Sequence, residues 1–204
     1  MKIHGTLTSP FVRTTLVAAH EVGLGARITH VPEAVSNTEA NSKLTSLSAL
    51  GKVPVLETDH AHAIHDSRVI VEYLCHVAGN STLLPDDGVK RFKVLTLQAL
   101  GQGLSESAVA YRYETAVRPQ GLQWPAWMDR TRLRFQEVFD DLESNWLGCL
   151  ADVTAGSITV AVALSYCDYR LAEFQWRQGR PQLASFHAAF SKRDSMMKTA
   201  LPTP

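Results

Sequence analysis

Two hydroxyl side chains, Thr8 and Ser9, stand directly before a proline in the segment TSPFVR near the start of the chain. Proline is favoured in the first turn of a helix, so Pro10 indicates a helix that runs from Phe11 to about Val22. The free N–H groups and the dipole of a helix N-terminus favour a negative charge. Thr8 and Ser9 are therefore candidates for holding an anion, although a plain helix cap is the simpler interpretation of this motif alone.

A second candidate motif is GKVPVL, residues 51–56, in which Pro54 interrupts a run of strand-forming residues. Because proline has no N–H to donate, it is expected at the first residue of a strand. A third motif, Asp66-Ser67, precedes a predicted helix that ends at about Ala78. A serine at a helix start can offer its N–H and hydroxyl to a carboxylate, and the aspartate can offset a cation, but capping again explains the pair taken alone.

The elements that position these motifs form an α/β region at residues 1–78. Short strands are predicted at 2–7 and 27–31, and the segments VPVLE and AHAIH follow as two strands joined by a turn at Asp59. An irregular helix is expected around 36–48. Together with the two helices given above, these elements follow the order βαβαββα.

The rest of the chain is predicted to be helical. Residues 79–88 are rich in turn formers and are expected to be a linker. Residues 89–204 contain no convincing strand, and four segments suit helices: 89–116, 125–148, 155–173 and 182–192.

Composition limits the classes of function. The 204 residues are 45% hydrophobic, and 20 basic side chains balance 20 acidic ones, which argues against a cationic nucleic-acid-binding face. No stretch reaches the roughly 18 apolar residues of a membrane span, and the amino terminus lacks a signal-peptide pattern. Cys75, Cys149 and Cys167 form no CxxC motif and predict neither a disulfide framework nor a zinc site. A cytoplasmic protein without nucleic-acid or membrane partners is expected.

The histidines of DHAHAIHD, residues 59–66, raise the question of a metal site because imidazole is a common metal ligand. A turn followed by a short strand would place His60 and His62 on an exposed hairpin, which is the simpler explanation. No metal is therefore expected.

In its three motifs the chain resembles the cytosolic glutathione transferases, in particular bacterial and tau- or theta-like members of the serine type. The segment DVTAGSITVAVAL, residues 152–164, is also similar to the family's capping motif, with Thr154 as cap and Ser157 where aspartate is usual. Because Ser157 can return only a neutral hydrogen bond, a weaker cap is expected. The resemblance implies a thioredoxin-like domain at 1–78 and, after the linker, an all-helical domain at 89–204.

The resemblance implies that Ser9 donates a hydrogen bond to the sulfur of glutathione and favours the thiolate over the thiol. Thr8 matches the serine of theta-like relatives and is the alternative. The tyrosine used in other classes is excluded because none occurs before Tyr73. The cysteines lie far downstream, so conjugation or thiol-assisted isomerisation is favoured over reductase chemistry.

The same resemblance assigns the other contacts of glutathione, the expected co-substrate. Pro54 is expected to follow a cis peptide bond, which opens the backbone of Val53 for pairing with the cysteinyl part of the tripeptide. Lys52 is expected to meet the glycyl carboxylate. Ser67 is expected to meet the γ-glutamyl carboxylate and Asp66 the ammonium group beside it.

The second substrate is expected to be a small hydrophobic electrophile that enters between the two domains. The predicted pocket residues are Phe11, Tyr111, Arg112, Tyr113 and Trp124. The resemblance further implies a homodimer and a transferase that serves detoxification. Two alternatives stay open: a non-catalytic glutathione-binding or regulatory protein, and a glutathione-dependent isomerase or dehalogenase.

Overall fold

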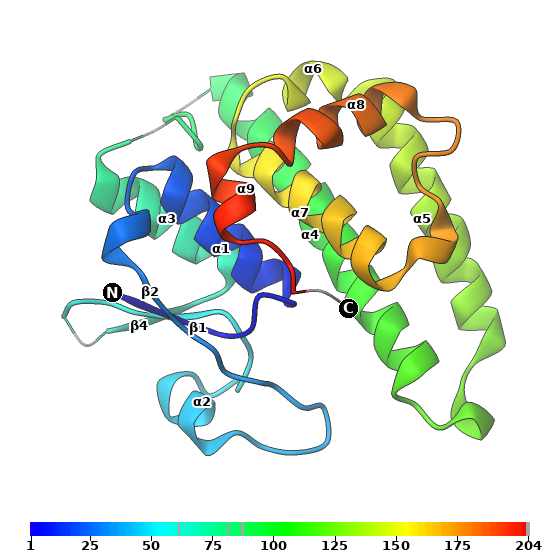
Figure 1. The fold of residues 1–204 in the computed structure, drawn as a ribbon, viewed down its shortest axis with the longest axis horizontal. Coiled ribbons are helices and arrows are strands. Elements are labelled where there is room, and N and C mark those ends of the chain that lie inside the picture. Colours follow the sequence, from blue (N-terminus) through cyan, green and yellow to red (C-terminus); the bar gives the residue numbers. More distant parts are fainter. Residues whose placement is uncertain (61, 81, 87, 203–204) are drawn as a thin grey trace. The chain divides into compact units, whose positions relative to one another are not determined.

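The structure is a computed structural model that describes residues 1–60, 62–80, 82–86 and 88–202. The chain divides into two compact units. One comprises Met1–Gly88 together with Arg193–Pro204, and the other comprises Val89–Lys192. The predicted fold class is confirmed, because the first unit contains a mixed sheet with helices and the described part of the second is helical (Figure 1).

The sheet of the first unit follows the predicted order of elements. Its strands among the described residues are β1 (Lys2–His4), β2 (Thr29–Val31), β3 (Val55–Glu57) and β4 (Ala63–His65). They lie in the order β2-β1-β3-β4, with β1 parallel to β2 and antiparallel to β3, and β3 antiparallel to β4. Ile3 pairs with Leu56, and both side chains are fully buried. Successive side chains of a strand point to opposite faces of the sheet, so the paired residues Ile3 and Leu56 enter the core on the same face.

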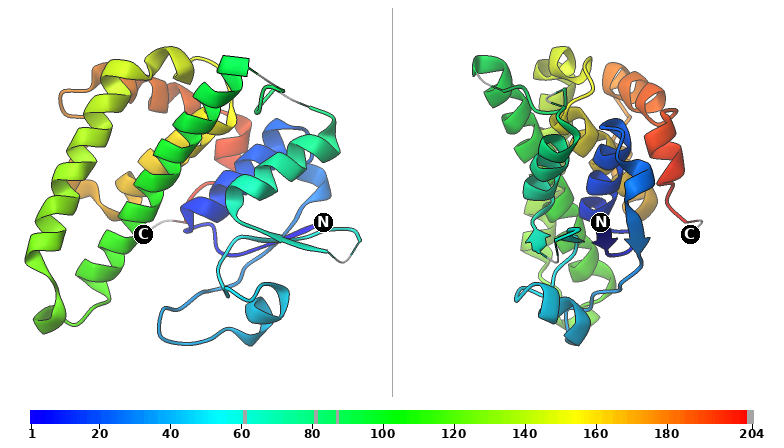
Figure 2. Two further views of the ribbon diagram at one scale, coloured as in Figure 1. Left: turned by 180° about the vertical axis from the view of Figure 1, so that it is seen from behind. Right: turned by 90° about the vertical axis from the view of Figure 1, so that its left-hand side faces the viewer.

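Helices cover the sheet from both sides. Helix α1 (Pro10–Glu21) starts one residue earlier and ends one residue earlier than predicted, and α3 (Ser67–Ala78) has the predicted bounds. The two helices pack against each other on one face, whereas α2 (Ser42–Leu47) lies beyond the other (Figures 1 and 2). A short 3₁₀ turn, η1 (Gly25–Arg27), leads into β2.

The last helix, α9 (Asp194–Lys198), belongs to the first unit, which corrects the predicted domain range 89–204 at its end. The physical reason is a set of polar contacts with α1. Arg13 Nε donates to the carbonyl of Thr199 at 2.9 Å, and Arg193 Nε donates to Glu21 Oε1 at 2.7 Å. Of the predicted linker 79–88, residues 81 and 87 lie outside the described part of the chain.

The second unit is built from α4 (Gly88–Ala116), η2 (Gln120–Leu122), α5 (Pro125–Asn145), α6 (Leu147–Leu150), α7 (Ala155–Arg170), η3 (Ala172–Phe174) and α8 (Pro181–Phe190). The predicted helix 125–148 is divided at Trp146, and the predicted helix 155–173 ends at Arg170, before η3. Helix α7 is buried along most of its length in the core. None of the described helices combines the length and hydropathy needed to cross a membrane.

The cap of α7 forms with serine in place of the usual aspartate. The N–H of Ser157 donates to Thr154 Oγ1 at 3.2 Å, and the N–H of Thr154 donates to Ser157 Oγ at 2.9 Å. The Ser157 hydroxyl also donates to the carbonyl of Asp152 at 2.8 Å. The capping box is thus reciprocal, and its neutral acceptor agrees with the expectation from the sequence.

Candidate functional site

Ser9 is the N-cap of α1. Its Oγ accepts a hydrogen bond from the N–H of Val12 at 3.4 Å, and its own N–H donates to the carbonyl of Thr6 at 3.0 Å. Within the described residues, the hydroxyl proton of Ser9 has no acceptor. The half-buried hydroxyl is thus able to donate to a ligand at the positive end of the helix.

Thr8 differs from Ser9 in its hydrogen bonding. Its Oγ1 lies 3.0 Å from Oγ1 of Thr6, and either hydroxyl can be the donor of this pair. Thr6 was not identified as a functional residue from the sequence, although the run TLTS places three hydroxyls within four residues. The pairing with Thr6 favours Ser9 over Thr8 as the hydroxyl that is available to a ligand.

The second motif meets the first at Gly5, directly after β1. The Val53–Pro54 peptide bond is cis, which confirms what the resemblance implied. A Cβ atom on Gly5 would clash with Val12 Cγ2 of α1 and lie 2.9 Å from Val53 Cβ, so Gly5 lies between α1 and the loop before Pro54. Neither the N–H nor the carbonyl of Val53 has a hydrogen-bond partner among the described residues. Gly5 was missed from the sequence because it lies inside the predicted strand 2–7, which ends at His4 in the structure.

Lys52 is exposed beside Val53 and forms no ion pair with a carboxylate in the described part of the chain. Its ammonium group is a compact charge on a flexible side chain. It can therefore reach a carboxylate of a ligand that pairs with the Val53 backbone.

Asp66 and Ser67 lie where α3 begins. Asp66 has a φ of 70°, and its Oδ1 accepts from the N–H of Arg68 at 2.9 Å. Arg68 also holds this carboxylate through Nε at 3.1 Å and Nη2 at 3.0 Å, and these bonds lower the pKa of Asp66 below its ordinary value. Ser67 is 3% exposed. Arg68 was missed from the sequence because its pairing depends on the unusual backbone of Asp66.

The predicted pocket residues differ in burial. Phe11 is half-buried in α1 of the first unit, and the others belong to the second. Tyr111 is 1% exposed and packs against Phe135 and Phe174, whereas Trp124 at the start of α5 is 65% exposed. Arg112 and Tyr113 are half-buried. Tyr111 therefore contributes to the core of the helical unit.

The histidines and cysteines give no sign of metal or thiol chemistry in the described residues. No group of three His, Cys, Asp or Glu side chains that could hold a metal occurs among them. His60 and His62 flank residue 61, which lies outside the described residues. All three cysteines are free thiols, and burial raises the pKa of Cys75 to about 11 and that of Cys167 further. The thiols of Cys75 and Cys167 are therefore protonated at neutral pH and react slowly.

Comparison with known proteins gives consistent results. Residues 8–77 match the family model for the N-terminal domain of glutathione S-transferase. A glutathione transferase family member from Pseudomonas fluorescens Pf-5, solved with bound glutathione, is 34% identical over 99% of each chain, with a TM-score of 0.96. A glutathione S-transferase from Methylobacillus flagellatus KT, solved with glutathione bound, is 30% identical over 98% of each chain, with a TM-score of 0.86. The uncharacterized GST-like protein YibF of Escherichia coli (strain K12) is 29% identical over 99% of each chain.

Proposed function

Because the chain belongs to the glutathione transferase family, we propose that it binds glutathione and transfers the glutathione thiolate to a soft electrophilic carbon. The observation that carries this proposal is the Ser9 hydroxyl, whose proton has no acceptor among the described residues at the N-terminus of α1. That arrangement suits an anionic sulfur, because a hydroxyl donor and the helix dipole both stabilise negative charge.

Ser9 stabilises the thiolate without becoming the nucleophile. Its hydroxyl donates to the sulfur, and each unit by which the thiol pKa falls corresponds to about 1.4 kcal/mol. The proton of glutathione then leaves more readily near neutral pH, and the sulfur attacks the electrophile. Thr8 is the less favoured donor because its hydroxyl is shared with Thr6.

The rest of the tripeptide is held by the other two motifs. The backbone of Val53 pairs with the cysteinyl unit as an added strand would. Lys52 attracts the glycyl carboxylate, and Ser67 donates to the γ-glutamyl carboxylate. Asp66, kept ionised by Arg68, attracts the γ-glutamyl ammonium group.

The acceptor substrate is a small hydrophobic electrophile, which fits a role in detoxification. Phe11, Arg112, Tyr113 and Trp124 are the candidate residues for its binding, whereas Tyr111 belongs to the core of the helical unit. The protein acts in the cytoplasm as a homodimer. Its free cysteines suit the reducing compartment in which glutathione is abundant.

A substrate panel with and without glutathione tests the proposal. Turnover that requires glutathione is expected, together with the ultraviolet absorbance of a thiolate on the bound complex near neutral pH. Ser9→Ala is expected to raise the thiol pKa of bound glutathione by about one unit or more, which is a tenfold loss of thiolate at a pH below that pKa. Thr8→Val, which keeps Ser9, is expected to retain the thiolate.

Two results would contradict the proposal in different ways. Binding of glutathione without a thiolate band would indicate a non-catalytic binding protein. A thiolate that is unchanged in Ser9→Ala would exclude the serine mechanism, and loss of the thiolate in Thr8→Val alone would assign the role to Thr8. Melting temperatures of both variants separate these outcomes from loss of the helix cap, which costs about 1 kcal/mol.

A further inference from the structure

Arg13 is a buried cation in the first turns of α1 that the proposed mechanism does not use. Its side chain is 6% exposed, and its only partners among the described residues are two carbonyl oxygens. Nε donates to Thr199 at 2.9 Å and Nη2 to Met196 at 3.4 Å. Burial lowers the pKa of Arg13 to about 10, so it stays charged near neutral pH. Burying a charge without a carboxylate partner destabilises the folded protein, so a functional role for Arg13 is worth testing.

The two carbonyls that Arg13 binds lie at the C-terminal end of α9. The last carbonyls of a helix have no partner within the helix and carry its negative dipole end, so the guanidinium group acts as a cap. At the far end of α1, Glu21 accepts from Arg193 Nη2 at 2.8 Å and from the Ser195 hydroxyl at 2.5 Å. The segment Arg193–Thr199 is therefore fastened to α1 at both ends, and we call it the C-terminal brace.

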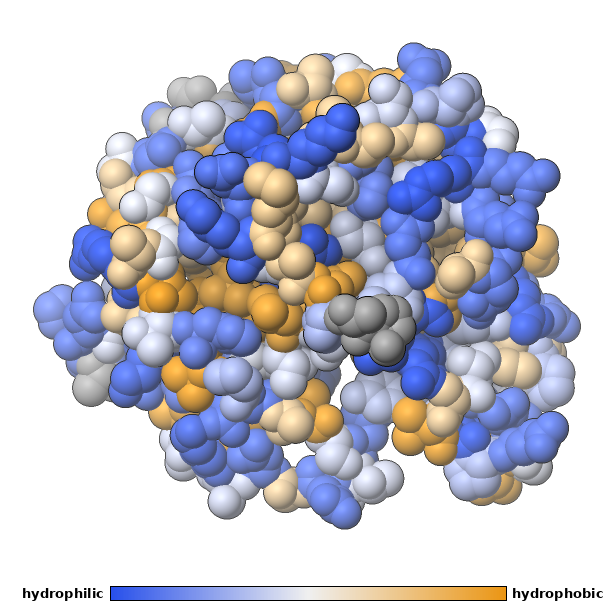
Figure 3. Space-filling view, in the orientation of Figure 1, coloured by the Kyte–Doolittle hydropathy of each residue, from blue (hydrophilic) through white to orange (hydrophobic). Residues whose placement is uncertain are grey.

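The brace depends on these polar contacts along part of its length. A cavity of about 110 Å³ lies beside it, lined among others by Leu7, Leu16, Lys198 and Thr199. On the face of the molecule that Figure 3 shows, some hydrophobic residues (orange) reach the surface between hydrophilic ones. Met196 and Thr199 are each 2% exposed, so the brace is also packed against the first unit, and the hydrogen bonds of Arg13 add to that packing.

Arg13 connects the brace to the turn that carries Ser9. The N–H of Arg13 donates to the carbonyl of Ser9 at 3.0 Å. The Arg13 side chain extends from this same turn to the carbonyls of Met196 and Thr199 in the brace. Figures 1 and 2 show the chain after α9 running toward the end at which α1 starts. Through Arg13, the brace thus contacts α1 in the turn that follows its N-cap residue, Ser9.

We propose that Arg13 is a positioning residue, which fixes the C-terminal brace to the first turn of α1 and so sets the place of the Ser9 hydroxyl against the glutathione sulfur. This inference rests on the proposed function. Arg13 touches neither glutathione nor the electrophile in this role. Its loss is expected to change the thiol pKa and kcat and to leave the affinity for the thiol form of glutathione in place, because Lys52, Val53 and Ser67 are unaffected.

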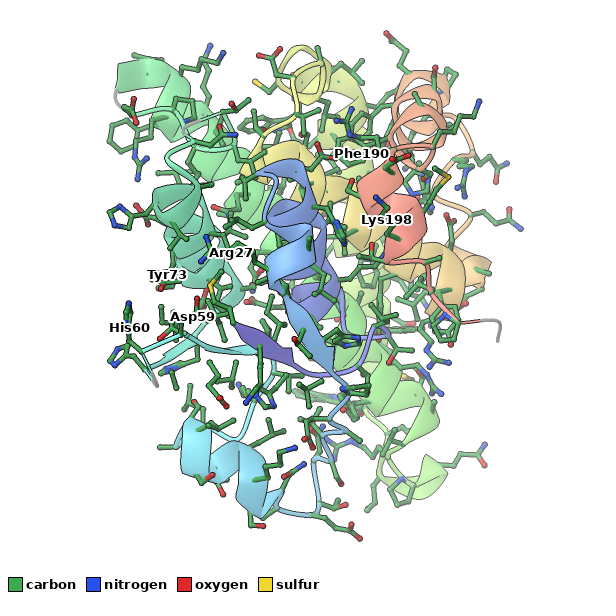
Figure 4. All side chains as sticks on the ribbon, turned by 60° about the vertical axis from the view of Figure 1, so that its left-hand side comes forward. Arg27, Asp59, His60, Tyr73, Phe190 and Lys198 are labelled. Carbon is green, nitrogen blue, oxygen red and sulfur yellow. The ribbon has the colours of Figure 1, made fainter. Side chains whose placement is uncertain are left out.

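The test measures the thiol pKa of bound glutathione from its thiolate absorbance over a range of pH, together with glutathione affinity by calorimetry. Arg13→Met, which keeps the length of the side chain, is expected to raise the thiol pKa by about one unit, which is a tenfold loss of thiolate at a pH below that pKa. At the same pH, where bound glutathione is mostly the thiol, the affinity is expected to change less than twofold. Arg13→Lys, which keeps the charge and one donor group, is expected to recover part of the shift. Arg27→Met is the matched control, because Arg27 is an exposed arginine of the same unit that pairs with Asp59 (Figure 4).

The outcomes separate the inference from the function on which it rests. If the unaltered protein forms no glutathione thiolate, the proposed function fails. If it forms one and both Arg13 variants keep its pKa, Arg13 is only structural and the inference is wrong, whatever happens to the melting temperature. Should Arg13→Met fail to fold, Arg13→Lys decides alone, and an unchanged thiol pKa in that variant overturns the proposal.

Discussion

Gly5 and Val53 approach so closely that a Cβ atom on Gly5 would lie 2.9 Å from Cβ of Val53. The φ of Gly5 is 135°, a value that favours glycine. The N–H of Gly5 donates to the carbonyl of Val31 at 3.0 Å, and its carbonyl accepts from His30 Nε2 at 2.6 Å. Gly5 is therefore held by β2 on one side, and a side chain on it would displace the loop before Pro54.

Gly5→Ala is expected to destabilise the protein by about 1–3 kcal/mol, the cost of overpacking, and to weaken glutathione binding more than this loss of stability accounts for. The reason is that the Val53 backbone, which is proposed to pair with glutathione, must move. Urea unfolding and calorimetric titration measure the two effects. Gly103→Ala is the control, because a Cβ there meets nothing within 4 Å. Glutathione affinity that is unchanged in folded Gly5→Ala would contradict the placement of Val53 in the site.

The elements that the sequence predicted well are those with local signals. The bounds of α3 follow from a capping pair and a hydrophobic face, and those of α1 from a proline in the first turn. The cis bond at Pro54 was implied by the family resemblance, which rests partly on the six residues around this proline. In each case the residues that determine the structure are neighbours in the chain.

The features that the sequence did not predict depend on distant partners. The Arg13–Thr199 contact joins residues that are 186 positions apart, and no local pattern indicates it. The difference between Tyr111 in the core and Trp124 at the surface likewise depends on how the helices pack, because both are aromatic residues near helix ends. Tertiary contacts decide such positions, whereas propensity and periodicity do not.

Lys52 is expected to contribute to glutathione affinity through charge alone. Lys52→Met should raise the dissociation constant about two- to fivefold at low salt, the range of an exposed ion pair, and leave kcat nearly unchanged. The difference from the unaltered protein should shrink as salt is added, because exposed charges are screened. Calorimetric titration at low and high salt measures both effects, with Lys93→Met as an exposed lysine of the second unit for comparison. If Lys52→Met and the unaltered protein bind glutathione with equal affinity at low salt, Lys52 does not contact the bound tripeptide.

The cysteines are expected to take no part in the reaction. Burial raises the pKa of Cys75 to about 11, and Cys167 is also buried, so both should resist alkylation by iodoacetamide near neutral pH. The half-buried Cys149 should react first. Mass spectrometry of the native protein locates the label, with urea-unfolded protein as the control in which all three react. Glutathione-dependent turnover that disappears as Cys149 is labelled would contradict this expectation.

Glu21 is expected to make stability depend on pH. Its hydrogen bonds with Arg193 and Ser195 lower its pKa below the ordinary value of 4.5. A carboxyl with a lowered folded-state pKa stabilises the protein fully above its ordinary pKa, and this contribution is lost as the pH falls through the folded-state pKa. Glu21→Gln should therefore lower the free energy of unfolding near neutral pH by about 1–3 kcal/mol, the range for hydrogen bonds to a charged group. The gap between Glu21→Gln and the unaltered protein should close as the solution is acidified below the ordinary pKa of glutamate. Urea unfolding over a pH series measures it, and a gap that stays constant into acid would show that the carboxylate charge does not hold the C-terminal brace.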